Sequence, residues 1–222
     1  MTSNVRAVLF DWDGTLVDTA EATFRCYVRL FAELGVAFDR EIYARTYSPN
    51  WHQTFRMLDI PKERWPHADA RWLHHFAEEQ FALMDGAREL LDALHTRGIE
   101  TGIVTSGSRE RVRRELDVHQ FAFRECVFGC DVKEKKPHPE GLLLCLDRMR
   151  IDAHEAVYVG DSPEDIAMAR AAGVYSIAVP GGYPNRDALL ASRPDRFAES
   201  LREVWSAVAT LPLSNSAARA QL

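Results

Sequence analysis

The sequence offers little scope for disulfide or zinc chemistry. Its four cysteines, at positions 26, 126, 130 and 145, are scattered through 222 residues without a CxxC pair. Cys126 and Cys130 could lie near each other, but two sulfurs without a nearby histidine support no zinc site. We therefore expect reduced and mostly buried thiols.

The chain also lacks an apolar leader, an apolar run of membrane-spanning length, internal repeats and low-complexity blocks. From this we expect a cytoplasmic protein without a membrane partner. A formal net charge of -6 leaves no basic surplus and disfavours nonspecific nucleic-acid binding. It does not exclude an anionic substrate, because a bound metal ion can invert the local field.

The order of the predicted elements indicates a doubly wound, Rossmann-like α/β fold with a parallel sheet. The length, with 46% hydrophobic and 27% charged residues, suits one large α/β domain or a core with a small insertion. Strands alternate with helices from residue 86 onward, and this alternation implies right-handed crossovers. We expect strands at 5–10, 99–104, 123–128, 156–159 and 174–179, and helices at 87–97, 109–118, 140–150, 163–172, 186–192 and 200–209.

The apolar pattern of residues 19–83 differs from that of the rest of the chain, because it is helical and contains no strand signal. We expect helices at 20–35, 40–46, 51–58 and about 68–84, separated by proline-containing breaks. We interpret 19–83 as an all-helical cap inserted into a core formed by 1–18 and 84–211. Residues 212–222 have little to bury, and we expect a flexible tail there.

One stretch organises the rest of the chain. A buried strand runs to Phe10 and stops at Asp11-Trp12-Asp13-Gly14-Thr15. Two acids just past a strand end can turn toward one ligand, and Gly14 lets the backbone approach that ligand closely. A surface turn would explain the same residues if no other motif matched them.

Three later strand ends also carry polar residues, and strand ends are where an open parallel sheet binds its ligands. Thr105-Ser106-Gly107-Ser108 could bind an anion, although helix capping by Ser106 or Ser108 would explain it alone. Lys135-Lys136-Pro137 could hold one lysine in place or be a solvated patch. Gly160-Asp161-Ser162-Pro163-Glu164-Asp165 could bind a metal or cap a helix.

These four motifs, in this order, resemble the haloacid dehalogenase-like (HAD) hydrolase superfamily. The similarity is strongest to its phosphatase branch with a helical (C1-type) cap, which includes phosphoglycolate phosphatases. The resemblance implies that Asp11 is the nucleophile that forms an aspartyl-phosphate and that Asp13 is the general acid and base. It also implies that Thr105, Ser106 and Gly14 bind the phosphoryl group and that Lys136 offsets charge at Asp11.

The resemblance further implies a Mg²⁺ site formed by Asp11, Asp13, Asp161 and Asp165. Asp13 would contribute its backbone carbonyl, and Asp165 would anchor the others or bind through water. Charge counting supports the metal, because each like pair at about 4 Å costs roughly 4 kcal/mol at an effective dielectric near 20. One lysine cannot balance four carboxylates and a phosphate, and all-oxygen ligands favour Mg²⁺ over zinc.

Departures from related patterns select among reactions of the superfamily. Its dehalogenases lack the second acid, which is present here as Asp13, and its phosphonate-cleaving members use a cap lysine, for which only Lys62 is available. Sugar phosphomutases often carry Glu where this chain has Gly160, so hydrolysis is favoured and a β-phosphoglucomutase-like activity is the alternative. A non-catalytic phospho-ligand-binding module is a third reading, but none of the motif residues has been lost.

We therefore expect a Mg²⁺-dependent phosphatase, monomeric or homodimeric, that acts on a small phosphorylated metabolite. The cap should set the choice of substrate by closing over the site. Arg45 could bind a substrate carboxylate or phosphate, or lie on a solvated helix face. His52 is a weaker substrate-binding candidate that could be a surface or packing residue. Asn50 and Trp51, near the same break between the cap helices, and Arg109 of the core are further candidates.

Overall fold

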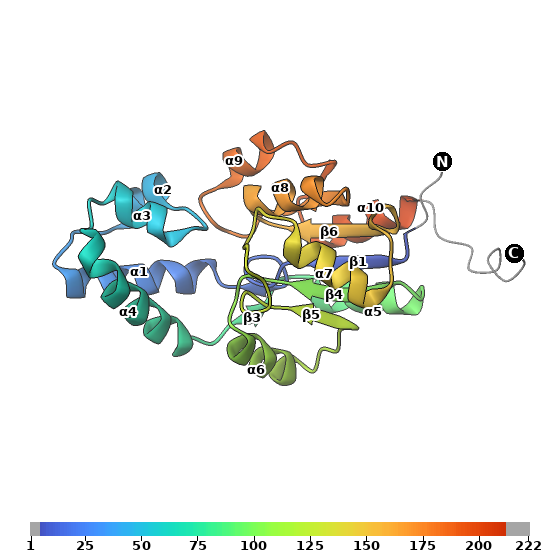
Figure 1. Ribbon diagram of the computed structural model, residues 1–222, viewed down its shortest axis with the longest axis horizontal. Helices are drawn as coiled ribbons and strands as arrows, with labels where there is room; N and C mark the ends of the chain where they lie inside the picture. The colour runs from blue at the N-terminus through green and yellow to red at the C-terminus, as the bar shows by residue number, and fades with distance from the viewer. Residues whose placement is uncertain (1–4, 212–222) are drawn as a thin grey trace, which may run out of the picture.

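A six-stranded parallel sheet lies at the centre of the computed structural model, which describes residues 5–211 (Figure 1). The chain begins in the middle of the sheet, builds one side, and then crosses to build the other, which gives the order β5-β4-β1-β6-β7-β8. The strands are β1 (Ala7–Phe10), β4 (Glu100–Val104), β5 (Glu125–Val127), β6 (Ala156–Gly160), β7 (Tyr175–Ala178) and β8 (Arg196–Phe197).

Side chains of the two central strands alternate between two apolar layers. Val8 and Phe10 of β1 pack into one cluster, and Ala7 and Leu9 pack into the other. This period of two explains why the strand reads as a continuous apolar run, since both of its faces are buried.

Helices cover both faces of the sheet, as the doubly wound fold requires. The layer on the Phe10 side includes α5 (Ala87–Thr96), α6 (Arg109–His119) and α10 (Leu201–Thr210). The opposite layer includes α7 (Glu140–Met149) and α8 (Pro163–Ala171), with α9 (Arg186–Ala191) beside α8. The predicted fold class is confirmed, although the predicted elements omitted the short edge strand β8.

A helical cap stands beside the carboxyl ends of the strands, at the left in Figure 1. It contains α1 (Ala20–Leu34), α2 (Arg40–Thr46), α3 (Trp51–Met57), the short 3-10 helix η1 (Lys62–Arg64) and α4 (Trp65–Ala77). The cap has its own apolar core, in which Tyr27, Phe31 and Phe55 are fully or almost fully buried.

A two-stranded antiparallel ribbon joins the cap to the core. It pairs β2 (Val17–Asp18) with β3 (Ala82–Leu83), which lies where we predicted the end of a helix. The prediction of a helix at 68–84 and of no strand in 19–83 was therefore wrong at this end. The helix ends at Ala77 because the next residues must turn back to pair with β2.

The four cysteines are free, as expected, but only Cys26 and Cys145 are buried. Cys126 is half-buried and Cys130 is exposed, so the expectation of mostly buried thiols held for two of the four. No helix within residues 5–211 is both long and apolar enough to cross a membrane. The predicted flexible tail at 212–222 lies outside the described residues.

Candidate active site

Three buried aspartates meet where β1 and β6 end. Asp11 follows β1, Asp161 follows β6, and Asp165 lies in the first turn of α8. Each offers a carboxylate oxygen, and these oxygens all lie within 4.8 Å of one another. They converge because β1 and β6 are hydrogen-bonded neighbours whose carboxyl ends share one edge of the sheet.

Lys136 is the cation at the centre of this cluster. Its Nζ lies 2.6 Å from Asp11 Oδ1 and 2.7 Å from Asp165 Oδ1, and it also donates to the Tyr158 hydroxyl at 2.8 Å. Tyr158 in turn donates to the backbone carbonyl of Val104 at 2.9 Å. These contacts hold the ammonium group against the proposed nucleophile. Lys135, the other lysine of the pair, is exposed.

Asp165 is fixed by the start of its own helix. Ser162 is the N-cap of α8, and it exchanges hydrogen bonds with Asp165 in a capping box. The capping reading of this motif is therefore correct for Ser162, and it leaves Asp161 free to face the cluster. The Asn185 amide donates to the Asp161 backbone carbonyl at 3.0 Å, which holds the turn in place.

Burial makes the charged form of these acids costly. Desolvation, opposed mainly by Lys136, raises the pKa of Asp11 to about 7. Desolvation, and then the like charge of Asp165, raises the pKa of Asp161 well above its usual range. Burial works against the charge of Lys136, but the carboxylates of Asp11 and Asp165 outweigh it and raise its pKa.

This donor set fits a hard divalent cation. The oxygens of Asp11, Asp161 and Asp165 are all carboxylate oxygens, and Lys136 is the only cation in hydrogen-bonding contact with the cluster among the described residues. Three buried carboxylates with one ammonium leave negative charge uncompensated, and oxygen donors suit Mg²⁺. The carboxylate of Asp13 is not part of this cluster; the ligand that the resemblance implies for this residue is its backbone carbonyl.

Asp13 is instead held by an arginine of the core helix α6. The Arg111 guanidinium donates to both Asp13 oxygens, at 2.9 Å and 2.5 Å, in a bidentate pair. The same guanidinium donates to Glu115 at 3.1 Å, one turn along α6, and Glu115 accepts the indole N–H of Trp12 at 2.6 Å. Trp12, which stands between the two acids in the sequence, therefore ties their turn to α6.

Arg111 was not among the site residues predicted from the sequence. Its only local signal was the spacing of Arg111 and Glu115, four residues apart on a predicted helix, which is ordinary for a surface ion pair. Arg109, the core arginine that we considered, pairs with Asp131 instead. The choice between the two arginines depends on which face of α6 points toward β1.

Gly14 lies in a turn that has no room for a side chain. Its φ of +79° is in the left-handed region, and a Cβ there would come within 2.4 Å of an Asp161 oxygen. Such a Cβ would also approach Tyr183, whose hydroxyl lies 2.7 Å from that of Thr19. The Tyr183 ring stacks on Tyr47 of the cap with centroids 4.9 Å apart, so this contact joins cap and core.

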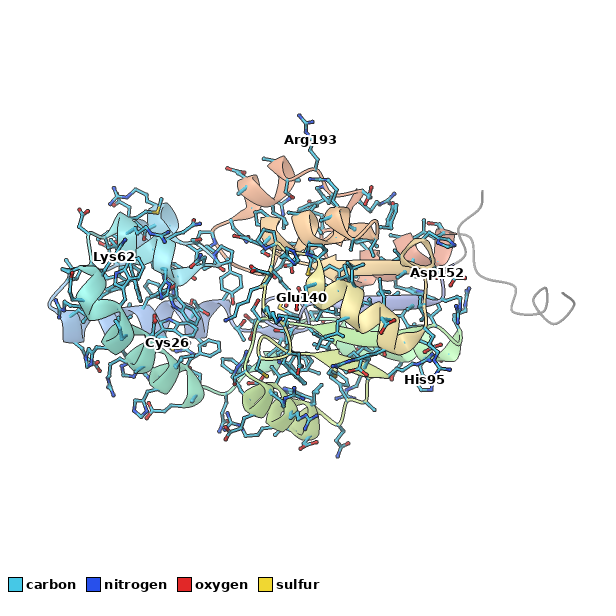
Figure 2. The ribbon with its side chains drawn as sticks, viewed as in Figure 1. Cys26, Lys62, His95, Glu140, Asp152 and Arg193 are labelled. Atoms are coloured by element: carbon cyan, nitrogen blue, oxygen red, sulfur yellow. The ribbon has the colours of Figure 1, made fainter. Side chains whose placement is uncertain are left out.

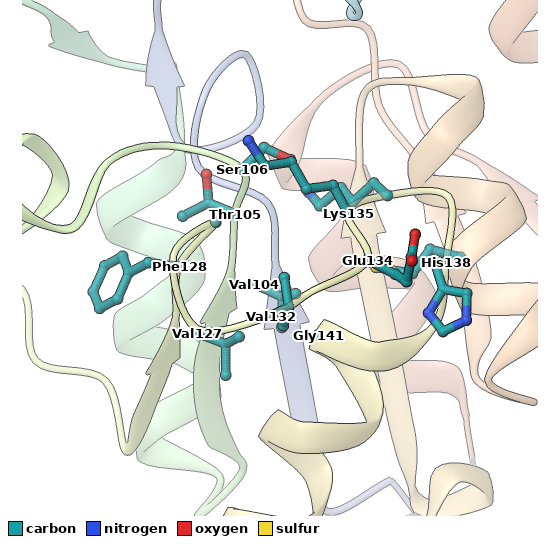
Figure 3. Close-up of a pocket in the computed structure, with 13 residues that line it drawn as sticks. Val104, Thr105, Ser106, Val127, Phe128, Val132, Glu134, Lys135, His138 and Gly141 are labelled. Atoms are coloured by element: carbon teal, nitrogen blue, oxygen red, sulfur yellow. The ribbon is translucent and has the colours of Figure 1, made fainter.

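Thr105 and Ser106 lie at the end of β4, as predicted. The Thr105 hydroxyl accepts a hydrogen bond from the Gly107 N–H at 3.0 Å, and Ser108 is the N-cap of α6. Thr105, Ser106 and Lys135 also line a small hollow of about 10 Å³, whose wall includes Lys136 as well (Figure 3). This hollow has room for about one water molecule.

A cavity of about 750 Å³ lies between the cap and the core. The structure brings most of the predicted site residues to its wall: Asp11, Asp13, His52, Thr105, Ser106, Lys136, Asp161 and Asp165. The side chain of His52 is already engaged, because its Nε2 lies 3.0 Å from both oxygens of Asp69 and its ring stacks on Trp65.

Arg45 does not reach this cavity. It is exposed on α2, pairs with Glu41 one turn away at 3.3 Å, and is not among the residues of the cavity wall. This position is that of a residue on a solvated helix face. Lys62, the only lysine of the cap, is likewise exposed and outside the wall (Figure 2).

Comparisons with known proteins agree with this geometry. The family model of the haloacid dehalogenase-like hydrolases matches residues 8–179. A phosphoglycolate phosphatase of Salmonella paratyphi A is 32% identical over 243 aligned positions, which cover 96% of each chain.

Solved structures extend the likeness to the fold. A haloacid dehalogenase-like hydrolase from Bacteroides fragilis has a TM-score of 0.81 at 27% identity, covering 90% of this chain and 100% of that one. CbbY from Rhodobacter sphaeroides, solved in complex with phosphate, has a TM-score of 0.73 at 28% identity, covering 90% and 96%.

Proposed function

The chain belongs to the haloacid dehalogenase-like hydrolase family as one of its phosphatases, and we propose that it hydrolyses the phosphomonoester of a small metabolite through an aspartyl-phosphate and with Mg²⁺. The observation that carries this proposal is the placement of Asp11 against Lys136 and within the cluster of three buried aspartates, with Asp13 on the same cavity wall. A nucleophile, an acid and a charge-balancing cation thus face one space.

In the first step a carboxylate oxygen of Asp11 attacks phosphorus. The bond between phosphorus and the ester oxygen breaks, its electron pair stays on the ester oxygen, and Asp13 supplies the proton that makes the free alcohol. Lys136, the Thr105 hydroxyl and the backbone N–H of Ser106 hold the equatorial oxygens, because the Thr105 N–H already donates to the Val127 carbonyl.

In the second step water attacks the phosphorus of the aspartyl-phosphate. Asp13, now a carboxylate, takes a proton from the water, and the electron pair of the breaking bond returns to Asp11. Inorganic phosphate leaves, and transfer of the Asp13 proton to the next leaving group completes the cycle. The bidentate bond from Arg111 leaves each Asp13 oxygen with a second lone pair, so the clamp orients Asp13 without blocking it.

Asp11, Asp161 and Asp165 are the side chains that would hold Mg²⁺. When bound, the ion would offset the charge of these carboxylates and of the phosphate dianion, which Lys136 alone cannot do. The fit rests on the buried all-oxygen donor set, with a backbone carbonyl of Asp13 as the further ligand that the family resemblance implies.

A β-phosphoglucomutase-like activity is the alternative, and Gly160 argues against it. A Cβ at this position would lie 2.5 Å from Asp165 Cβ and Cγ, so the Glu often found there in such mutases does not fit without displacing Asp165. A non-catalytic binding module would have no need to keep Asp11, Asp13, Lys136 and Asp161 together.

The test is hydrolysis of p-nitrophenyl phosphate with and without Mg²⁺. We expect activity that EDTA abolishes and Mg²⁺ restores, and we expect Asp11→Asn to lose it by several orders of magnitude. Acid quenching followed by peptide mass spectrometry should find the phosphate adduct on Asp11. The matched control is Asp85→Asn, since Asp85 is an exposed acid whose partner is Arg202. Wild-type turnover by Asp11→Asn would exclude this nucleophile.

A further inference from the structure

The cavity between cap and core has two chemically different walls. The core wall carries the proposed phosphate chemistry, including Asp11 and Thr105, whereas the cap wall is formed by residues of α1, α3, α4 and the segment 47–50. Its volume of about 750 Å³ is in the range of sites that enclose ligands much larger than a phosphate group. The alcohol part of the substrate must lie against the cap wall, because the phosphoryl group is held at the core.

The cap wall carries no lysine or arginine among its described residues. The three such cations that line the cavity all come from the core, and two of them are already paired. Arg111 is engaged by Asp13 and Glu115, and Lys136 by Asp11 and Asp165. Lys135 stands beside Thr105 and Ser106, at the phosphoryl end. The Arg111 guanidinium lies over the Phe76 ring of the cap, 5.0 Å from its centroid, but Asp13 and Glu115 already engage it. A second anionic group on the alcohol would therefore meet no unpaired lysine or arginine at the described cap wall.

A row of aromatic rings occupies the cap wall instead. The rings of Trp51 and Trp72 have centroids 4.8 Å apart, and Trp72 stacks on Phe76 at 4.6 Å. Trp51 is half-buried and is held by a hydrogen bond of 2.9 Å from its indole N–H to Asp69. Leu73, which follows Trp72 on α4 and lines the same cavity, is 50% exposed although it is a large apolar residue. Trp72 and Phe76 are themselves buried, so Trp51 and Leu73 supply most of the apolar surface that this wall presents to the cavity.

Two amide side chains border these rings. Asn50 Oδ1 accepts from the His52 N–H, and Gln53 Oε1 accepts from the Ser48 hydroxyl. No residue of the described chain accepts a hydrogen bond from their amide nitrogens, and both residues are exposed at the cavity wall. They offer donors to acceptor atoms at the edge of a ring stacked on Trp51.

We propose that the leaving group is a bulky, uncharged alcohol with a flat ring that bears acceptor atoms, as in a nucleoside 5′-monophosphate. A short acid such as glycolate would leave most of the cavity unfilled and its carboxylate unpaired, at the cost that an uncompensated charge carries near apolar surface. This inference rests on the proposed phosphatase function, since it names the substrate class of the same site.

The test compares kcat/KM for AMP, UMP, 2-phosphoglycolate and acetyl phosphate with Mg²⁺. We expect kcat/KM for the two nucleotides to be at least about tenfold higher than kcat/KM for 2-phosphoglycolate. Stacking on Trp51 predicts that Trp51→Leu raises the KM for the nucleotides about tenfold relative to its effect on acetyl phosphate, which has no ring. The matched control is Met57→Ala on the same helix, because Met57 is 61% exposed and outside the cavity wall.

A charge-adding variant gives a second measurement. Gln53→Arg puts a guanidinium on the cap wall. It should raise kcat/KM for 2-phosphoglycolate and so lower the preference for nucleotides, measured as their kcat/KM divided by that for 2-phosphoglycolate. Preference of the wild type for 2-phosphoglycolate, or equal effects of Trp51→Leu on all esters, would overturn the inference. Absence of Mg²⁺-dependent hydrolysis of p-nitrophenyl phosphate would instead refute the proposed function, so the two failures are distinguishable.

Discussion

Replacing Arg111 with methionine tests how the acid of this site is held. The change keeps an apolar side chain of similar length but removes the guanidinium that lies between Asp13 and Glu115. The Arg111 and Glu115 side chains are 10% and 9% exposed, and that of Asp13 is 24% exposed. Removing one partner of a buried ion pair costs about 3–5 kcal/mol, because the remaining charge stays buried without compensation.

We expect a loss near the lower end of that range, about 3 kcal/mol, because Asp13 is partly solvated and Glu115 keeps its bond from Trp12. Burial, opposed by Arg111, raises the pKa of Glu115. Without Arg111 this pKa rises further, so the deficit should be smaller at pH 5, where Glu115 can be neutral, than at pH 8. Urea unfolding followed by tryptophan fluorescence measures both values. Arg111→Met/Glu115→Gln should recover much of the loss.

The same variant has a kinetic signature that general destabilisation would not produce. If Arg111 positions Asp13 as the acid, its loss should lower kcat/KM more for alkyl phosphates, whose leaving alkoxide needs the proton, than for p-nitrophenyl phosphate. General acid catalysis typically contributes a factor of about 10²–10⁴ to the rate, and the loss of kcat/KM for the alkyl esters should be of this order. An unfolding loss below 1 kcal/mol, or equal effects on both ester types, would refute the role given to Arg111.

Three further predictions concern the aspartate cluster and its surroundings. In the metal-free protein, stability should fall as pH rises between about 4 and 7, because the pKa of Asp11 is raised from 3.8 to about 7 and the folded state binds more protons than the unfolded state over that window. Thermal melts in EDTA at pH 5 and pH 8 measure this, and added Mg²⁺ should raise the melting temperature more at pH 8; the same melting temperature at both pH values in EDTA would contradict it. Gly14→Ala should cost more stability, by urea unfolding, than Gly35→Ala, since both have positive φ but only the Gly14 Cβ would meet neighbouring atoms. Tyr183→Phe should cost about 1–2 kcal/mol, because it removes the hydroxyl partner of the buried Thr19; a neutral result would mean that water replaces it.

Much of the site could be predicted because its residues follow buried strands. An apolar run such as Val8 to Phe10 predicts a strand that is covered on both faces. An acid directly after such a strand has no packing reason to be there. Four such turns in a β/α alternation must share one edge of the sheet, so Asp11, Thr105, Lys136 and Asp161 could be brought together without coordinates. Helix caps such as Ser162 are local as well, since they depend on a few consecutive residues.

What the sequence did not determine depends on the rotation and packing of whole elements. Whether Arg109 or Arg111 reaches Asp13 is decided by the face that α6 turns toward β1, and a two-residue difference on a helix moves a side chain to a different face. Arg45 was excluded from the cavity in the same way, by the orientation of α2. The strand β3 is two residues long, too short to leave a periodic pattern, and it forms only because β2 offers it an edge.

Local sequence thus determined the chemistry at the strand ends, because the position of each of those residues is fixed by the strand that it follows. The tertiary structure decided which cations remain free, which rings line the cap and how Trp12 is connected to Asp13. Those properties depend on pairs of residues that are far apart in the chain. Such residues come into contact only after the elements of the cap and the core have packed.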